Sequence, residues 1–122
     1  MNLNQVTLPS SNIPVSIEFY KKFGLKPIVI SDHYARFEMP NGSSTFSVSL
    51  KDGPTDSSIK TYFEVEDLKK VVLDLEAKGI SFAMQPKLQS WMWEEALVKD
   101  PDDNVIILYT AGINRKFPPW RI

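Results

Sequence analysis

Two tryptophans in the second half of the chain are the side chains best suited to binding a small molecule. Trp91 and Trp93 are two positions apart, so on a β-strand both would project from the same face. Indole rings stack on flat molecules and attract cations to their faces. The protein core or a subunit interface would equally suit them, and both interpretations stay open. The other rings expected in such a ligand-binding wall are Phe37, Tyr62 and Tyr109.

The charged residue with the clearest chemical potential is Lys60. Alternation along its predicted strand places it on the same face as Tyr62 and Glu64. An ammonium group withdrawn from water needs a carboxylate, such as that of Glu64, or an anionic ligand. A solvated Lys60 at the edge of a cavity is the simple alternative. The remaining charges near these rings are expected to face solvent or the rim of a site: Arg36, Glu38, Glu94 and Glu95.

No nucleophile arrangement can be assembled from this sequence. The single histidine, His33, falls in a predicted turn, and there is no cysteine to pair with it. A Ser/His/Asp or Cys/His arrangement needs a histidine held between its partners. We therefore assign no catalytic residue.

The composition is that of one globular domain. The chain has 122 residues, of which 43% are hydrophobic and 24% charged. A net charge of −1 and a pI near 5.8 give no electrostatic reason to expect nucleic acid or a membrane as partner. The absence of cysteine excludes disulfides and thiolate metal sites. No apolar run approaches the roughly 20 residues of a membrane-spanning helix, so we expect a cytoplasmic protein.

The secondary-structure elements that must position these residues are predicted to follow the same order in both halves of the chain. In the first half, alternation and helical spacing predict a strand, a helix and three strands, over residues 3–8, 13–23, 25–30, 34–39 and 45–50. Ser11 or Asn12 can cap the helix, and Gly24 ends it. A polar loop over residues 51–58, with Gly53 and Pro54, is the best internal boundary.

The second half repeats this order. It predicts a strand over 59–65, a helix over 68–78 capped by Glu66 or Asp67, a strand over 80–84, a connection over 86–90 and a closing hairpin. In that hairpin, residues 96–98 and 105–109 flank a turn at 100–104. Gly24 and Gly79 end the two helices 55 residues apart. The chain is thus predicted to be one domain, with modules over about 1–52 and 58–112 and a tail over 113–122.

Each module is a βαβββ unit whose helix covers one sheet face. We therefore predict an α+β fold, in which two modules form a curled mixed sheet around a cavity. Alternation places a mixed, largely polar set of side chains on the face away from the helices, which suits a partly wet cavity. The candidate ligand-binding residues on this face are Gln5, Ser47, Ser49, Lys60, Tyr62, Ile107 and Tyr109.

Several motifs, in order, resemble the vicinal oxygen chelate superfamily. They are SIEFYKKFGL at 16–25, YFEVEDL at 62–68, LEAKGI at 75–80 and KDPDDN at 99–104, the last followed by a strand. This superfamily includes glyoxalase I, bleomycin-resistance proteins and extradiol dioxygenases. The resemblance implies a divalent metal held by His, Glu or Gln from the first and last strand of each half. The corresponding positions here are Gln5, Ser47 or Ser49, Lys60 and Ile107.

These positions are poorly suited to a metal. A catalytic metal needs about three protein ligands, and here only the Gln5 amide oxygen is a ready one. A serine hydroxyl is a poor ligand, a protonated lysine has no lone pair, and isoleucine has no donor. We expect no metal site and no other cofactor.

The preferred hypothesis is a metal-free binding protein, similar to the bleomycin-resistance branch, that sequesters an aromatic or cationic compound. One alternative is a non-metal isomerase- or lyase-type enzyme that uses Lys60 or Glu64. Another is a structural or regulatory dimer without ligand, and a glyoxalase-like metalloenzyme with an atypical site ranks last. The apolar tail, with Phe117, Trp120 and Ile122, is expected to cover the chain's own cavity or a partner, which favours a homodimer.

Overall fold

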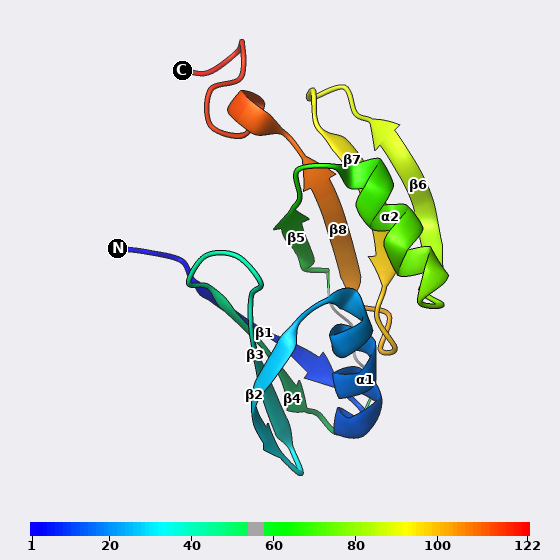
Figure 1. The fold of residues 1–122 in the computed structure, drawn as a ribbon. Coiled ribbons are helices and arrows are strands. Elements are labelled where there is room, and N and C mark those ends of the chain that lie inside the picture. Colours follow the sequence, from blue (N-terminus) through cyan, green and yellow to red (C-terminus); the bar gives the residue numbers. More distant parts are fainter. Residues whose placement is uncertain (54–57) are drawn as a thin grey trace. The chain divides into compact units, whose positions relative to one another are not determined.

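A computed structural model describes residues 1–53 and 58–122, and it contains two successive β-α-β-β-β arrangements (Figure 1). The first comprises β1 (Gln5–Ser10), α1 (Ile13–Phe23), β2 (Lys26–Ser31), β3 (Tyr34–Glu38) and β4 (Thr45–Leu50). The second comprises β5 (Lys60–Glu64), α2 (Leu68–Ala77), β6 (Phe82–Leu88), β7 (Glu94–Lys99) and β8 (Val105–Thr110). A short 3₁₀ helix, η1 (Gly112–Arg115), follows. The prediction of an α+β fold made of two βαβββ modules is confirmed.

Both sheets have the same mixed topology. The strand orders are β1-β4-β3-β2 and β5-β8-β7-β6. The pairs β1–β4 and β5–β8 are parallel, and the other neighbours are antiparallel. In each module the helix lies on one face of its sheet (Figure 1). The opposite face, which no helix covers, is called the open face below.

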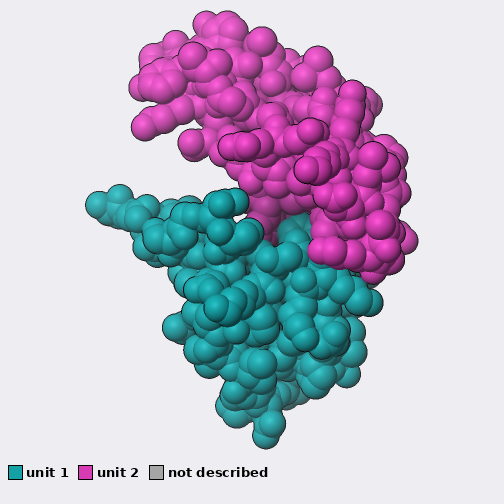
Figure 2. Space-filling model, viewed as in Figure 1, with its two compact units in different colours: residues 1–57, 100–104 teal, residues 58–99, 105–122 magenta. Residues whose placement is uncertain are grey.

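The described chain divides into two compact units. Unit 1 contains residues 1–57 and 100–104, and unit 2 contains residues 58–99 and 105–122 (Figure 2). The boundary falls in the polar loop expected over 51–58, of which residues 54–57, including Pro54, lie outside the described residues. The turn between β7 and β8 therefore belongs to unit 1, although its residues lie within the second module in the sequence.

Capping residues set the starts of both helices. The Asn12 side chain accepts a hydrogen bond from the Val15 N–H at 3.1 Å, and Asp67 accepts one from Lys70 N–H at 3.2 Å. The structure thus selects one of the two caps expected at each helix. Gly24 has φ +107°, the left-handed conformation in which glycine commonly ends a helix.

Two strands continue further along the chain than the sequence predicted, and both are edge strands. Strand β1 runs through Pro9 to Ser10, and β6 runs through Pro86 to Leu88, where the sequence suggested a strand end and a connection. Both strands lie at the edge of their sheets. Proline lacks a backbone N–H, so an edge strand tolerates it on the unpaired side. As a consequence, β6 reaches almost to the turn that carries the tryptophans.

The core of unit 1 forms around Tyr20 on α1. Its ring centroid lies 4.7 Å from that of Phe46 and 5.6 Å from that of Phe37. Phe37 is fully buried on the helix side of the sheet, so its predicted place in a ligand-binding wall is wrong. The reason is the alternation along β3, where Ala35 and Phe37 face the helix and Tyr34 and Arg36 take the open face.

The Tyr20 hydroxyl ties α1 to the turn at residues 100–104. It donates a hydrogen bond to Asp100 Oδ2 at 2.6 Å. Asp100 also accepts bonds from the backbone N–H groups of Asp102 and Asn104, both at 2.9 Å, and from Asn104 Nδ2 at 2.8 Å. Burial and the adjacent carboxylate raise the pKa of Tyr20. Asp100 is therefore a structural acceptor with its hydrogen-bonding capacity well used.

Candidate functional site

The open face of unit 1 carries a polar network centred on Ser47, whose side chain is fully buried. Gln5 Nε2 donates to Ser47 Oγ at 2.6 Å, and the hydroxyl of Tyr34 lies 2.7 Å from the same oxygen. Arg36 Nε donates to the Tyr34 hydroxyl at 2.8 Å. The hydrogen bond with Ser47 and, to a smaller degree, the Arg36 guanidinium lower the pKa of Tyr34. The predicted residues Gln5 and Ser47 are thus brought into contact.

The positions that the superfamily resemblance assigns to a metal do not fit one. The Gln5 amide oxygen already accepts a hydrogen bond from the Thr45 hydroxyl. In unit 2, Ile107 is buried and has no donor atom, and Lys60 is exposed. Among the described residues, no three or more His, Cys, Asp or Glu side chains are grouped so as to hold a metal ion. Ser49 lies on the open face of unit 1, where its register partners are Pro9 and Tyr34.

The open face of unit 2 carries the aromatic residues. The rings of Trp93 and Tyr109 are stacked, with centroids 4.7 Å apart and planes 17° apart. Tyr62 meets both edge-on, at 6.0 Å from Trp93 and 5.7 Å from Tyr109. Ile107 and Ala111 extend this cluster as buried apolar neighbours. The predicted residues Tyr62, Trp93, Ile107 and Tyr109 therefore form one surface.

Trp91 reaches the same surface from a turn rather than from a strand. Strand β7 begins only at Glu94, so the expectation that both tryptophans project from one strand is wrong. The turn between β6 and β7 places Met92 at φ +67°, and Trp91 remains 43% exposed. Its indole Nε1 donates to Glu95 Oε2 at 2.7 Å. Trp93 Nε1 instead donates to the Asn114 carbonyl at 3.3 Å, which joins the start of the tail to this face.

Glu95 is the functional candidate that the sequence interpretation missed. It was expected to face solvent or the rim, yet only 4% of it is exposed. It is the cross-strand partner of Tyr109 on β8, and its charge contributes, after burial, to a raised pKa of Tyr62. The signal was present in the alternation of β7. Since Ala96 and Val98 face the helix, Glu95 must face the aromatic rings.

Lys60 and Glu64 do not form an ion pair with each other. Lys60 is exposed and has no ion pair with any described residue. Glu64 instead lies with Oε2 3.3 Å from Arg115 Nε. Tyr109 has a raised pKa because of burial and the nearby Glu64 carboxylate. Lys60 therefore lacks the desolvated surroundings that would make it a general base.

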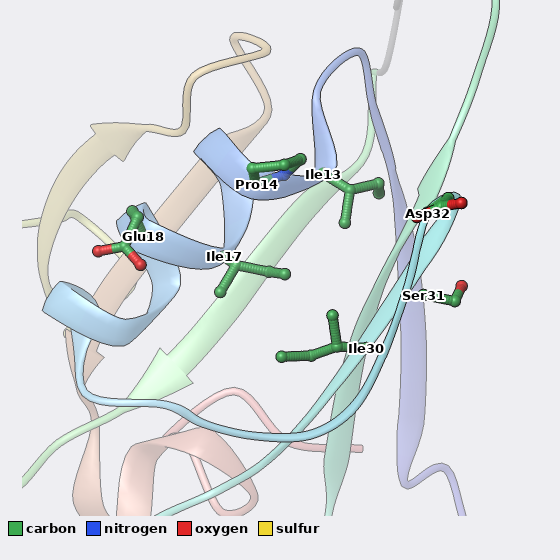
Figure 3. A pocket seen from close by; sticks show the side chains of 7 residues that line it. All are labelled: Ile13, Pro14, Ile17, Glu18, Ile30, Ser31 and Asp32. Carbon is green, nitrogen blue, oxygen red and sulfur yellow. The ribbon is translucent and has the colours of Figure 1, made fainter.

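A separate open depression lies between α1 and β2 on the helix side of unit 1 (Figure 3). Ile17 and Ile30 point toward one another across it (Figure 3). Its lining residues are Ile13, Pro14, Ile17, Glu18, Ile30, Ser31 and Asp32. It contains none of the predicted site residues and no aromatic ring, so the open faces remain the better candidates.

None of the described helices has the length and apolar character needed to cross a membrane.

Comparison with known proteins identifies a matching family and two relatives with similar sequences. The model of the Glyoxalase/Bleomycin resistance protein/Dioxygenase superfamily matches residues 2–108. The uncharacterized protein YraH of Bacillus subtilis is 28% identical, over 89% of this chain and 98% of its own length. A trivalent organoarsenical cleaving enzyme of a Bacillus species is 31% identical, but over only 59% of this chain and 46% of the enzyme.

Solved structures show the same fold. A bleomycin resistance determinant encoded on the transposon Tn5 superposes with a TM-score of 0.76 at 19% identity, covering 92% of this chain and 99% of that chain. The family match spans most of the sequence, and the paired βαβββ modules agree with it. The chain belongs to the Glyoxalase/Bleomycin resistance protein/Dioxygenase superfamily.

Proposed function

We propose that this protein binds a small organic molecule without using a metal, and that the molecule lies against the aromatic open face of unit 2. The observation that carries the proposal is the cluster of Tyr62, Trp93 and Tyr109 on a sheet face that no helix covers. Tyr62 in this cluster and the nearby Trp91 keep 42% and 43% of their surface exposed. Exposed rings held by a packed aromatic base offer a rigid stacking surface at little cost in side-chain entropy.

The chemistry of the donor atoms supports binding without metal. At the positions that the family uses for ligands, the side chains are an engaged amide, a hydrogen-bonded serine, an exposed lysine and an isoleucine. A divalent ion needs several oxygen or nitrogen ligands converging on one point. Stacking on rings needs none of these. The aromatic face is therefore the part of the molecule with the better fit to a ligand.

Similarity to the organoarsenical cleaving enzyme does not favour that activity here. The match covers less than half of that enzyme. Trivalent arsenic is a soft centre that prefers thiolate ligands, and this sequence has no cysteine. The exposure of Lys60 likewise withdraws support from an isomerase or lyase that uses it as a base.

Tryptophan fluorescence tests the binding proposal directly. A panel of planar compounds, neutral and charged, should change the emission of the wild-type protein in a saturable manner. The Trp91→Phe and Trp93→Phe variants should each lose part of the response, and the Trp120→Phe variant should keep it. A panel that leaves wild-type emission unchanged would contradict the proposal. A response that disappears only with Trp120→Phe would place the site elsewhere and would also contradict it.

We also propose that the protein forms a homodimer through its tail. In the single chain, Phe117 and Trp120 are 55% and 56% exposed, and Ile122 is also exposed. The tail is not without order, since Phe117 N–H donates to the Ile113 carbonyl at 2.8 Å and Arg121 lies over the Phe117 ring. Several large apolar side chains that are exposed close together in the sequence are typical of an interaction surface.

A further inference from the structure

Two carboxylates among the described residues are buried, and they differ in the number of hydrogen bonds that they accept. Asp100 accepts four hydrogen bonds in its turn. Glu95 accepts one, from the neutral indole N–H of Trp91. Its other oxygen, Oε1, accepts none from the described chain and is not fully sealed from solvent. A carboxylate withdrawn from water normally needs a counter-ion or several donors.

No described cation of unit 2 forms an ion pair with Glu95. Lys87 lies opposite Glu95 in the β6–β7 register, but it is exposed and forms no ion pair within the described chain. Arg115 is paired with Glu64. The surroundings of Glu95 are instead aromatic, with Tyr109 as its cross-strand partner and Tyr62 within electrostatic reach.

We propose that Glu95 is the charge-recognition residue of the aromatic face, and that the ligand carries an organic cation such as an amidine, an amine or a quaternary ammonium group. The proposal rests on the proposed binding function and names the ligand class of that site. The cation would contact Oε1, while Trp91 keeps its bond to Oε2 and holds the carboxylate in place. Ring faces add to the attraction, because their negative quadrupole favours a cation nearby. A charge-assisted hydrogen bond from N–H to carboxylate is stronger than one between neutral groups.

A matched series of three planar compounds tests the charge requirement. Benzamidine, benzamide and benzoate have nearly the same shape and carry charges of +1, 0 and −1. Titrated against the wild-type tryptophan emission, benzamidine should bind at least about tenfold more tightly than benzamide, and benzoate should bind most weakly. Equal affinity for benzamidine and benzamide would overturn the role of Glu95 and leave the binding function standing.

The neighbouring glutamate provides a control for the variant. Glu95→Gln keeps the size of the side chain and removes its charge, so it should abolish the preference for benzamidine over benzamide. Glu94→Gln changes the adjacent carboxylate, which points to the opposite side of β7, and should keep the preference. A preference that survives Glu95→Gln would contradict the proposal.

The outcomes separate the two proposals. If neither this series nor the wider panel of planar compounds changes the emission, the binding function fails and the cation proposal fails with it. If neutral planar compounds bind and charge makes no difference, only the cation proposal fails. The wild-type charge series decides between these outcomes even if Glu95→Gln does not fold.

Discussion

At the scale of single residues, the two open faces have opposite chemistry. Unit 1 presents hydroxyls, an amide and the Arg36 guanidinium, whereas unit 2 presents rings with the Glu95 carboxylate among them. Each arrangement follows from alternation along its strands, which places every second side chain on one face. The partners of each side chain then decide its chemistry. Tyr34 and Tyr62 illustrate this, because the hydrogen bond with Ser47 lowers the pKa of Tyr34, whereas burial and then the Glu95 charge raise the pKa of Tyr62.

The environment of Tyr34 leads to a spectroscopic prediction. Replacing Arg36 with Leu removes a donor and a positive charge from the phenol oxygen, so the pKa of Tyr34 should rise. Absorbance at the tyrosinate band during an alkaline titration measures this change, with Tyr34→Phe subtracted to identify the signal. Lys26→Leu serves as a control, because Lys26 is paired with Glu38, at the opposite end of β3 from Tyr34. A Tyr34 pKa unaffected by Arg36→Leu would show that the hydrogen bond is absent in solution.

At the scale of elements, the turn at residues 100–104 is a structural part of unit 1. Asp100 receives the hydroxyl of Tyr20 from α1, and Asn104 Nδ2 donates to the Pro9 carbonyl on β1 at 3.0 Å. The backbone N–H of Ser11, next to the α1 cap, donates to Asp102 at 2.9 Å. One turn thus holds the start of α1, the end of β1 and the central ring of the core. Its acidic and amide side chains serve packing rather than ligand binding.

Removing the Tyr20 hydroxyl should destabilise the protein in a pH-dependent manner. At pH 8, Tyr20→Phe leaves Asp100 short of one donor and should lower the free energy of unfolding by about 1–3 kcal/mol. Because the folded-state pKa of Tyr20 is raised above its ordinary value of 10.0, the stabilisation is complete below that pH. It is lost as pH rises further, since only the unfolded tyrosine ionises readily.

Urea denaturation at pH 8 and at pH 10.5 measures this effect. The stability difference between wild type and Tyr20→Phe should shrink at the higher pH. Tyr62→Phe provides a matched control, because Tyr62 is partly exposed and donates to no described residue, and it should change stability little. An unchanged difference for Tyr20→Phe across this range would contradict the assignment.

At the scale of the whole molecule, the chain is a duplicated module with an added tail. The two sheets share their strand order, and each has one helix on one face. The open face of the first module is polar, and the open face of the second module is aromatic. The tail begins against the sheet of unit 2, where Asn114 bonds to Trp93 and Arg115 pairs with Glu64, and its last apolar residues are exposed.

Deleting residues 117–122 tests the proposed homodimer. Light scattering coupled to gel filtration should give the mass of two chains for the full-length protein and of one chain for the truncated protein. The deletion begins after η1, so the contacts of Asn114 with Trp93 and of Arg115 with Glu64 remain. The Arg121→Gln variant, which keeps the apolar side chains, should stay dimeric. A full-length protein that is monomeric at micromolar concentration would refute the proposal.

The sequence by itself determined the features that depend on near neighbours. Helix α1 was predicted with its observed limits, and so was β4, because apolar spacing and capping groups act within a few residues. The same alternation identified most of the open-face residues, including Gln5, Ser47, Tyr62 and Ile107. These features need no knowledge of which strands pair.

Only the tertiary structure decided the features that depend on distant partners. Strands β1 and β6 continue through their prolines because both lie at sheet edges. The turn that contains Asp100 packs in unit 1 because Asp100 accepts a hydrogen bond from Tyr20, which is 80 residues away in the sequence. Glu95 became a buried carboxylate because a turn brings Trp91 onto it and β8 places Tyr109 beside it. Burial and charge compensation are set by the pairing of separate strands, and local residue patterns do not encode that pairing.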